Sequence, residues 1–244
     1  MSIISKKGDS NHWISFSDVM TGLMVIFMFI AISYMLEAQK KQDERDEIFK
    51  EFKQTKEDLY NELNDEFKND FQEWKVVLDK DLSIKFINPD VLFKAGQSTI
   101  PYKFSNLLDD FLPRYFNILL KDTFRDKIAE IRIEGHTDMT PTNSWEIPYI
   151  GNLKLSQMRS ASVMNQFISS PFYSSLLAKD RSWLQFNLTA NGMSYGKTLD
   201  ADKGFTYDTK NPVNKTFSRR VEFRIVTTSD KVVEKVLEEI NNKK

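Results

Sequence analysis

One acidic side chain interrupts the most apolar stretch of the chain. Asp18 is followed by eighteen uncharged, mostly apolar residues before the next charge, Glu37. A charged carboxylate within a membrane helix costs about 2.5–3.5 kcal/mol on insertion scales, which makes such an acid a candidate functional residue. At helical spacing Asp18 shares a face with Thr21, Gly22 and Val25, and the small Gly22 would let a second helix approach closely. Two interpretations follow: an acid that takes up and releases a proton inside the bilayer, or an interfacial acid that reaches the water.

Three short motifs in the C-terminal half carry most of the remaining candidate chemistry. They are GHTD at 135–138, NLKLSQMR at 152–159 and RRVE at 219–222. An aspartate and an arginine a few ångströms apart can grip a ligand that carries an ammonium and a carboxylate group, because a guanidinium holds a carboxylate through two charge-assisted hydrogen bonds. Taken singly, Asp138 could instead cap a turn or a helix, and Arg159 could lie on a helix surface.

The composition excludes several classes of function. The 244 residues include no cysteine and two histidines, which excludes disulfides and cysteine chemistry and argues against a multi-histidine metal centre. Lys and Arg number 34 against 35 Asp and Glu, so the net charge gives no overall attraction to nucleic acid. No catalytic set of residues stands out. We therefore expect a protein that is not an enzyme, has no cofactor and does not bind nucleic acid directly.

The element that must position Asp18 is a membrane helix at 13–36, preceded by a short tail at 1–12. An apolar helix of about 20 residues crosses a hydrocarbon core of about 30 Å. Trp13 and Tyr34 stand near its two ends, where amphipathic rings favour the interface. A cleaved signal peptide would have a shorter apolar region and a small-residue cleavage site, and neither is visible after Tyr34. The stretch therefore predicts an uncleaved anchor.

Residues 37–80 form a strongly charged connector. Neither glycine nor proline occurs between Met35 and Pro89, and apolar residues recur three, four or seven positions apart, which predicts a long helix with one apolar stripe. The heptads are imperfect, so we expect a helical stalk that can pair with a second copy of the chain. The stripe consists of Ile48, Phe52, Leu59, Leu63, Phe67, Phe71, Trp74 and Leu78.

From residue 81 to 244 the pattern becomes mixed and indicates a separate α+β domain. Apolar segments predict strands at 82–87, 128–134, 184–190 and 219–227. Helices are expected at 104–120 with a kink at Pro113, at 153–169, in a short piece at 173–179, and at 230–240. The expected fold is therefore a single N-terminal transmembrane helix, a helical connector and an α+β domain with a β-α-β-α-β pattern.

The membrane segment resembles the signature of MotB-type stator proteins. The matching residues are Trp13, Phe16, Asp18, Met20 and Thr21, followed by an apolar helix. The resemblance implies that Asp18, beside Thr21, binds the translocated ion, usually a proton. It implies a polytopic partner of the MotA or ZorA type, five of which surround two copies of this chain, and it makes the connector a candidate channel-closing plug. Within this family the chain most resembles the wall-anchored subunit of the Zorya anti-phage defence systems.

The three C-terminal motifs, in this order, resemble those of OmpA-like peptidoglycan-binding domains over roughly residues 82–227. The opening VLFKAGQSTI at 91–100 resembles the start of such domains, except that Pro101 follows directly. The resemblance implies an Asp–Arg grip on the diaminopimelate of peptidoglycan stem peptides. Two departures, Ser160 and Ser218, affect the fine shape of the pocket rather than the grip. The implied peptidoglycan-binding residues are Asp138, Arg159, Asn152, Leu155, Thr137 and Arg220.

The two halves of the chain predict one function. A wall-binding domain after the span implies a single-pass protein of the inner membrane, with the N-terminus in the cytoplasm and the C-terminal domain in the periplasm. We expect the peptidoglycan-anchored subunit of an ion-driven, MotAB-like motor, with Asp18 as the proton carrier and the Zorya system as the favoured setting. Two alternatives stay open: a flagellar MotB-type stator subunit, and a passive peptidoglycan tether without ion transport. The residues do not distinguish H⁺ from Na⁺.

Overall fold

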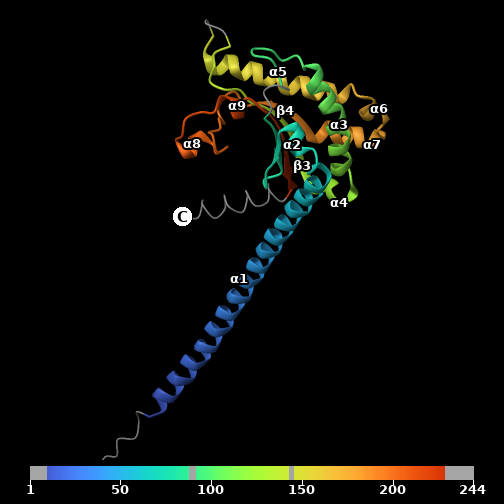
Figure 1. Cartoon of the computed structure of the whole chain (residues 1–244). Coiled ribbons are helices and arrows are strands. Elements are labelled where there is room, and N and C mark those ends of the chain that lie inside the picture. The colour runs from blue at the N-terminus through green and yellow to red at the C-terminus, as the bar shows by residue number, and fades with distance from the viewer. Residues whose placement is uncertain (1–9, 88–91, 143–145, 229–244) are drawn as a thin grey trace, which may run out of the picture. The chain divides into compact units, whose positions relative to one another are not determined.

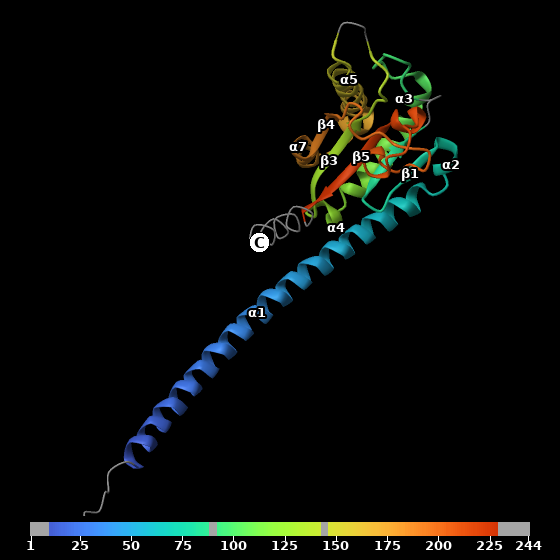
Figure 2. The same ribbon diagram turned by 90° about the vertical axis from the view of Figure 1, so that its left-hand side faces the viewer.

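The chain divides into two compact units, Met1–Lys50 and Glu51–Lys244. The computed structural model describes residues 10–87, 92–142 and 146–228. Helix α1 (Ser10–Phe67) contributes residues to both units, and all the strands belong to the second unit (Figures 1 and 2).

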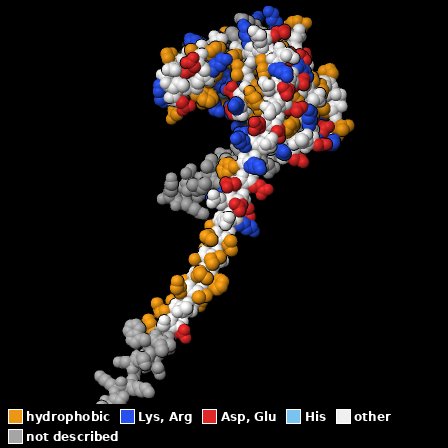
Figure 3. Space-filling model, turned by 60° about the horizontal axis from the view of Figure 1, so that its bottom comes forward, with side chains coloured by type: hydrophobic (Ala, Val, Ile, Leu, Met, Phe, Trp, Pro, Cys, Tyr) orange, Lys and Arg blue, Asp and Glu red, His pale blue; other side chains and the backbone are white. Residues whose placement is uncertain are grey.

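The first unit contains the apolar part of α1. Among the described residues, Phe16–Glu47 is the one helical stretch long and apolar enough to cross a membrane. Figure 3 shows hydrophobic side chains along this part of the helix, and those between Phe16 and Leu36 are exposed. Such a surface is unfavourable in water and suits a lipid environment. The anchor expected at 13–36 falls within this helix.

The second unit begins earlier than the sequence suggests, because the last turns of α1 belong to its hydrophobic core. Leu59, Leu63 and Phe67 are almost fully buried at four-residue spacing. The guanidinium of Arg114 holds the end of the helix by donating to the backbone oxygen of Glu66 (2.7 Å) and to its carboxylate (2.6 Å). The domain boundary expected at residue 81 therefore moves to residue 51. Over these turns the apolar stripe faces the core instead of lying on a solvated stalk.

A five-stranded sheet forms the centre of the second unit. Its order is β1-β2-β5-β3-β4, with β3 and β4 parallel and the other neighbours antiparallel (Figure 2). Strand β1 and helix α2 (Phe71–Trp74) occupy part of the stretch expected to be connector, and β4 begins later than expected because a helix continues to Asn187. The strands are β1 (Val76–Leu78), β2 (Ser83–Phe86), β3 (Ile128–Gly135), β4 (Leu188–Gly192) and β5 (Val221–Thr227).

Two longer helices of this unit support the site described below. Helix α3 (Tyr102–Leu119) continues through Pro113 and packs against α5 (Pro148–Ile168), which in turn packs on β3 and β4. Helix α5 begins at Pro148, and proline suits the first position of a helix because its fixed backbone angle is helical and its missing N–H is not needed there. The other helices are α4 (Asp122–Arg125), α6 (Pro171–Ser175), α7 (Ala178–Asn187), α8 (Thr206–Thr209) and α9 (Lys215–Ser218).

Aromatic rings fill the core between the sheet and these helices. The rings of Phe86, Phe111 and Phe223 contact one another with centroid separations of 4.9, 5.0 and 5.7 Å. The expected fold class, an N-terminal apolar helix followed by an α+β domain, is confirmed, with β1 as an additional strand. The helix expected at 230–240 lies outside the described residues.

Candidate functional site

Two glycines let α5 lie close to the ends of the central strands. A side chain at Gly135, the last residue of β3, would place its Cβ 2.2 Å from the backbone oxygen of Ser156. At Gly192, the last residue of β4, it would lie 2.6 Å from the backbone nitrogen of Gln157. Glycine is therefore required where the helix backbone approaches the strands. This close approach brings the NLKLSQMR motif on α5 beside the GHTD motif that follows β3.

A pocket of about 310 Å³ lies where these motifs meet. Five of the six predicted peptidoglycan-binding residues line it, together with Arg219 and parts of two loops. The five, drawn from two motifs, are Thr137, Asp138, Asn152, Leu155 and Arg159. The sequence motifs therefore converge in space, although their role in binding stays a prediction.

Asp138 is buried and held in place from two sides. Its Oδ1 atom accepts a hydrogen bond from the backbone N–H of Thr140 (2.7 Å), which forms a local turn. Its Oδ2 atom lies 3.5 Å from Nε of Arg219. In the described part of the chain no ion pair joins Asp138 to Arg159, although both line this pocket; the guanidinium that Asp138 contacts is that of Arg219.

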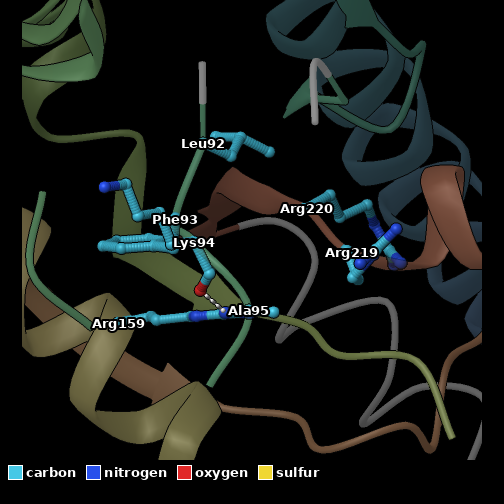
Figure 4. Close-up of a pocket in the computed structure, with 7 residues that line it drawn as sticks. All are labelled: Leu92, Phe93, Lys94, Ala95, Arg159, Arg219 and Arg220. Carbon is cyan, nitrogen blue, oxygen red and sulfur yellow. Dashed lines mark hydrogen bonds between the residues drawn. The ribbon is translucent and has the colours of Figure 1, made fainter. Parts of the chain in front are cut away.

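Arg159 is 5 % exposed and contacts a loop that precedes α3. Its Nε donates to the backbone oxygen of Gln97 (3.0 Å) and its Nη2 to that of Lys94 (3.1 Å). Figure 4 shows the bond to Lys94 and the side chain of Phe93 beside the guanidinium, whose central carbon lies 5.2 Å from the ring centroid. Burial first and the nearby charge of Arg219 second lower the pKa of Arg159 to about 10, with Asp138 acting in the opposite direction. Arg159 is therefore charged at neutral pH.

Asn152, Leu155 and Thr137 complete the wall of the pocket. The amide nitrogen of Asn152 donates to the backbone oxygens of Thr140 (2.9 Å) and Pro148 (3.0 Å), so Asn152 holds the loop that carries Asp138. Leu155 is buried and supplies an apolar surface. The hydroxyl of Thr137 is buried without a hydrogen-bond partner among the described residues, which leaves it available to a ligand.

Arg220, the sixth of the predicted peptidoglycan-binding residues, does not line this pocket. Its side chain is fully buried, with Nε donating to Glu222 Oε2 (3.1 Å) and Nη1 to the backbone oxygen of Lys197 (3.1 Å). Arg219 lines the pocket, whereas Arg220 belongs to a buried charge network, and both arginines line a neighbouring cavity of about 210 Å³ (Figure 4).

The buried network contains one group of side chains with the donor atoms of a metal site. Glu134, His136 and Glu222 bring their ligand atoms within 4.8 Å of one another, and His136 Nε2 lies 3.4 Å and 3.5 Å from the two carboxylates. Two guanidiniums already neutralise these acids: Arg220 bonds Glu222, and Arg224 donates to Glu222 Oε1 (2.7 Å) and lies 3.7 Å from Glu134. We therefore interpret the network as structural.

The other predicted site lies on the apolar part of α1. Asp18 is exposed in the isolated chain, and the hydroxyl of Thr21 donates to the backbone oxygen of Ser17 (2.8 Å). A side chain added at Gly22 would meet no atom within 4 Å, so this face of the helix is open.

Comparison with known proteins identifies the family. No family model matches the chain. The Zorya protein ZorB of Escherichia coli is 36 % identical over 237 residues, which cover 96 % of this chain and 95 % of that protein. The chain belongs to the ZorB family.

Several solved structures resemble this member of the ZorB family in fold. A MotB-like protein from Desulfovibrio vulgaris matches with a TM-score of 0.49 and 22 % identity, covering 73 % of this chain and 98 % of that one. The cell wall anchor of the type VI secretion system from Pseudomonas aeruginosa matches with a TM-score of 0.41 and 20 % identity, covering 68 % of this chain and 96 % of that one. The periplasmic domain of Helicobacter pylori MotB matches with a TM-score of 0.40 and 16 % identity, covering 66 % of this chain and 85 % of that one.

Sequence reasoning missed Arg219 as a pocket residue of this ZorB-family chain. The signal that would have found it is strand register. Strands β3 and β5 are antiparallel neighbours with Gly135 opposite Val221. The residues just after β3 therefore lie across from those just before β5, which brings Arg219 next to Asp138. Unless the pairing of these strands is known, the sequence does not show that RRVE lies next to GHTD in space.

Proposed function

We propose that this chain is the peptidoglycan-anchored subunit of an ion-driven membrane motor of the Zorya anti-phage type. The observation that carries the proposal is the single pocket in which the carboxylate of Asp138 lies with the guanidiniums of Arg159 and Arg219. Such a set of charges suits a ligand that presents an ammonium and a carboxylate close together. The diaminopimelate of peptidoglycan stem peptides has this chemistry.

Different residues of the pocket would recognise the ammonium and the carboxylate of this ligand. The ligand ammonium would lie beside Asp138, whose other oxygen is already fixed by Thr140. The ligand carboxylate would face Arg159, which is charged at neutral pH and has N–H groups beyond those bonded to the loop. Leu155 and the unpaired hydroxyl of Thr137 would contact the carbon chain and a polar group of the stem peptide.

Co-sedimentation with purified sacculi tests this part of the proposal. Full-length protein in detergent is mixed with diaminopimelate-containing peptidoglycan, and bound protein is measured in the pellet. We expect the wild type to sediment and the Asp138→Ala and Arg159→Ala variants to lose most of their binding. Arg181→Ala is a matched control, because Arg181 is a partly exposed arginine that lines neither cavity. Failure of the wild type to sediment would contradict wall binding.

The apolar helix supplies the second part of the proposal. If the wall lies on the side of the C-terminal unit, that unit is periplasmic and the N-terminus is cytoplasmic, so the chain is a single-pass inner-membrane protein. One helix cannot enclose an ion path, so Asp18 and Thr21 require a polytopic MotA- or ZorA-like partner. A unit charge that crosses about 100 mV releases about 2.3 kcal/mol, enough to bias a conformational cycle. Because the wall-bound chain is fixed, the motion would occur in the partner.

Two observations separate this proposal from its alternatives. A passive wall tether would need no acid in its membrane helix, whereas Asp18 stands at the start of the apolar stretch. A flagellar MotB-type stator subunit would share Asp18 and the pocket. The 36 % identity with a Zorya protein over almost the whole chain favours the defence system.

A further inference from the structure

The loop before α3 contacts Arg159 on two sides. Along one edge of the guanidinium, Nε–H and one N–H of Nη2 are donated to the backbone oxygens of Gln97 (3.0 Å) and Lys94 (3.1 Å). The ring of Phe93 lies 5.2 Å from the guanidinium carbon (Figure 4). A guanidinium this close to an aromatic ring is attracted to it electrostatically.

These contacts decide which part of Arg159 a ligand can use. Arginine has five N–H donors in a planar fork, and the loop occupies the two on the edge formed by Nε and Nη2. No other partner of Arg159 is present in the described part of the chain. The N–H groups of Nη1 and the second N–H of Nη2 therefore form the edge available to a carboxylate, which can hold them as a bidentate pair.

Phe93 is itself held by the core. Its ring meets that of Phe104 edge-on, with the centroids 5.6 Å apart and the planes at 84°. Phe104 is fully buried in α3. A chain of contacts thus runs from the hydrophobic core through Phe93 to Arg159. Because a free arginine side chain carries about 2 kcal/mol of rotamer entropy, fixing it before the ligand arrives favours binding.

We propose that Phe93 is a positioning residue for carboxylate recognition. Together with the backbone oxygens of Lys94 and Gln97, it fixes the Arg159 guanidinium so that only the edge formed by Nη1 and Nη2 meets the ligand. Phe93 acts through Arg159 and not by contacting the ligand. This inference rests on the proposed binding of the wall, and it gives Phe93 a role in addition to its packing against the core.

A double-mutant cycle on the full-length protein in detergent tests this inference, with sacculi as the probe. Phe93→Leu keeps an apolar side chain but removes the ring, and we expect it to lower the affinity about 2- to 30-fold, the range of a cation–π contact. Phe93→Tyr keeps the ring and should restore binding to within about twofold of the wild type. In an Arg159→Ala background, Phe93→Leu should cause no further loss.

A matched control separates this effect from the general loss of an aromatic contact. Arg125 lies over the ring of Trp183 at 5.5 Å, and neither residue lines the two cavities. Trp183→Leu therefore removes a comparable contact and should leave the affinity for sacculi unchanged. Unchanged binding of Phe93→Leu would overturn the inference. So would an equal loss with and without Arg159, because Phe93 would then act independently of the guanidinium.

A spectroscopic measurement without ligand distinguishes failure of this inference from failure of the proposed function. The ring of Phe93 should shift the NMR signal of the Arg159 Nε–H group, and Phe93→Leu should move that signal while Phe93→Tyr restores it. If the wild type does not bind sacculi, the proposed function fails, yet a moved signal still supports the positioning role. A signal that Phe93→Leu leaves in place overturns it.

Discussion

Asp138 and Arg219 lie next to each other in the pocket, with Oδ2 of the acid 3.5 Å from Nε of the arginine. Asp138 follows β3 and Arg219 precedes β5, and these two strands are antiparallel neighbours. Arg219 is 43 % exposed in its side chain, whereas Asp138 is buried, so Arg219 is the more accessible member of the pair. Arg219 therefore supplies a counter-charge to the buried carboxylate of Asp138.

We expect substitution of Arg219 to weaken wall binding moderately. Arg219→Ala removes one of the two guanidiniums that attract a carboxylate, but its exposure means that solvent screens the lost charge. Affinity for sacculi should therefore fall about 1.5- to 5-fold, less than for Arg159→Ala. Arg219→Lys keeps the charge, so its affinity for sacculi should lie between those of Arg219→Ala and the wild type. Tighter binding by Arg219→Ala would mean instead that Arg219 competes with the ligand for Asp138.

The buried His136 predicts a specific dependence of stability on pH. Burial lowers the pKa of His136 well below its usual value, Arg220, Lys197 and Arg224 add to this, and Glu222 opposes it. Between its usual pKa of 6.5 and the lowered value, the unfolded chain binds a proton that the folded chain does not. Stability should therefore be lost as the pH falls below 6.5, by at most about 1.4 kcal/mol per pH unit.

Denaturant unfolding of the full-length protein in detergent between pH 7 and pH 5 measures this dependence. The His136→Gln variant should show a flatter profile over the same interval, whatever its absolute stability, because the titrating group is gone. Stability that rises as the pH falls would show that the two nearby carboxylates stabilise a charged imidazole more than burial disfavours it.

The sequence predicted which residues line the pocket better than it predicted which groups those residues contact. GHTD and NLKLSQMR could be placed at a strand end and on a helix, because apolar periodicity fixes which face of an element is buried. The partners depend on long-range pairing: Asp138 meets Arg219 through the β3–β5 register, and Arg159 donates to a loop more than sixty residues earlier. The stripe of α1 shows the same limit. Spacing identified Leu59, Leu63 and Phe67 as one face, but not the core that covers it.

Gly135 should tolerate no side chain. An added Cβ would lie 2.2 Å from the backbone oxygen of Ser156, so α5 would have to move away from β3. We expect Gly135→Ala to destabilise the protein by about 1–3 kcal/mol, as overpacking does, and to weaken wall binding because α5 carries Asn152 and Arg159. Gly196→Ala is the control, since its Cβ would come no nearer than 3.4 Å to another atom. Equal thermal unfolding midpoints for both variants would contradict this account.

Substitution of Asp18 distinguishes a subunit of an ion-driven motor from a passive peptidoglycan tether. Asp18→Asn keeps the size of the side chain but removes its ionisable proton, so a chain that carries ions should lose its activity while still binding the wall. In cells with the complete Zorya system, we expect this variant to lose phage protection and yet to co-purify with its channel partner and sediment with sacculi. Thr21→Ala should reduce protection less, because the Thr21 hydroxyl donates only to the backbone of its own helix in the described structure. Full phage protection by Asp18→Asn would contradict the proposal that Asp18 carries the ion and would favour a passive tether. Loss of co-purification would instead place Asp18 in the assembly of the complex.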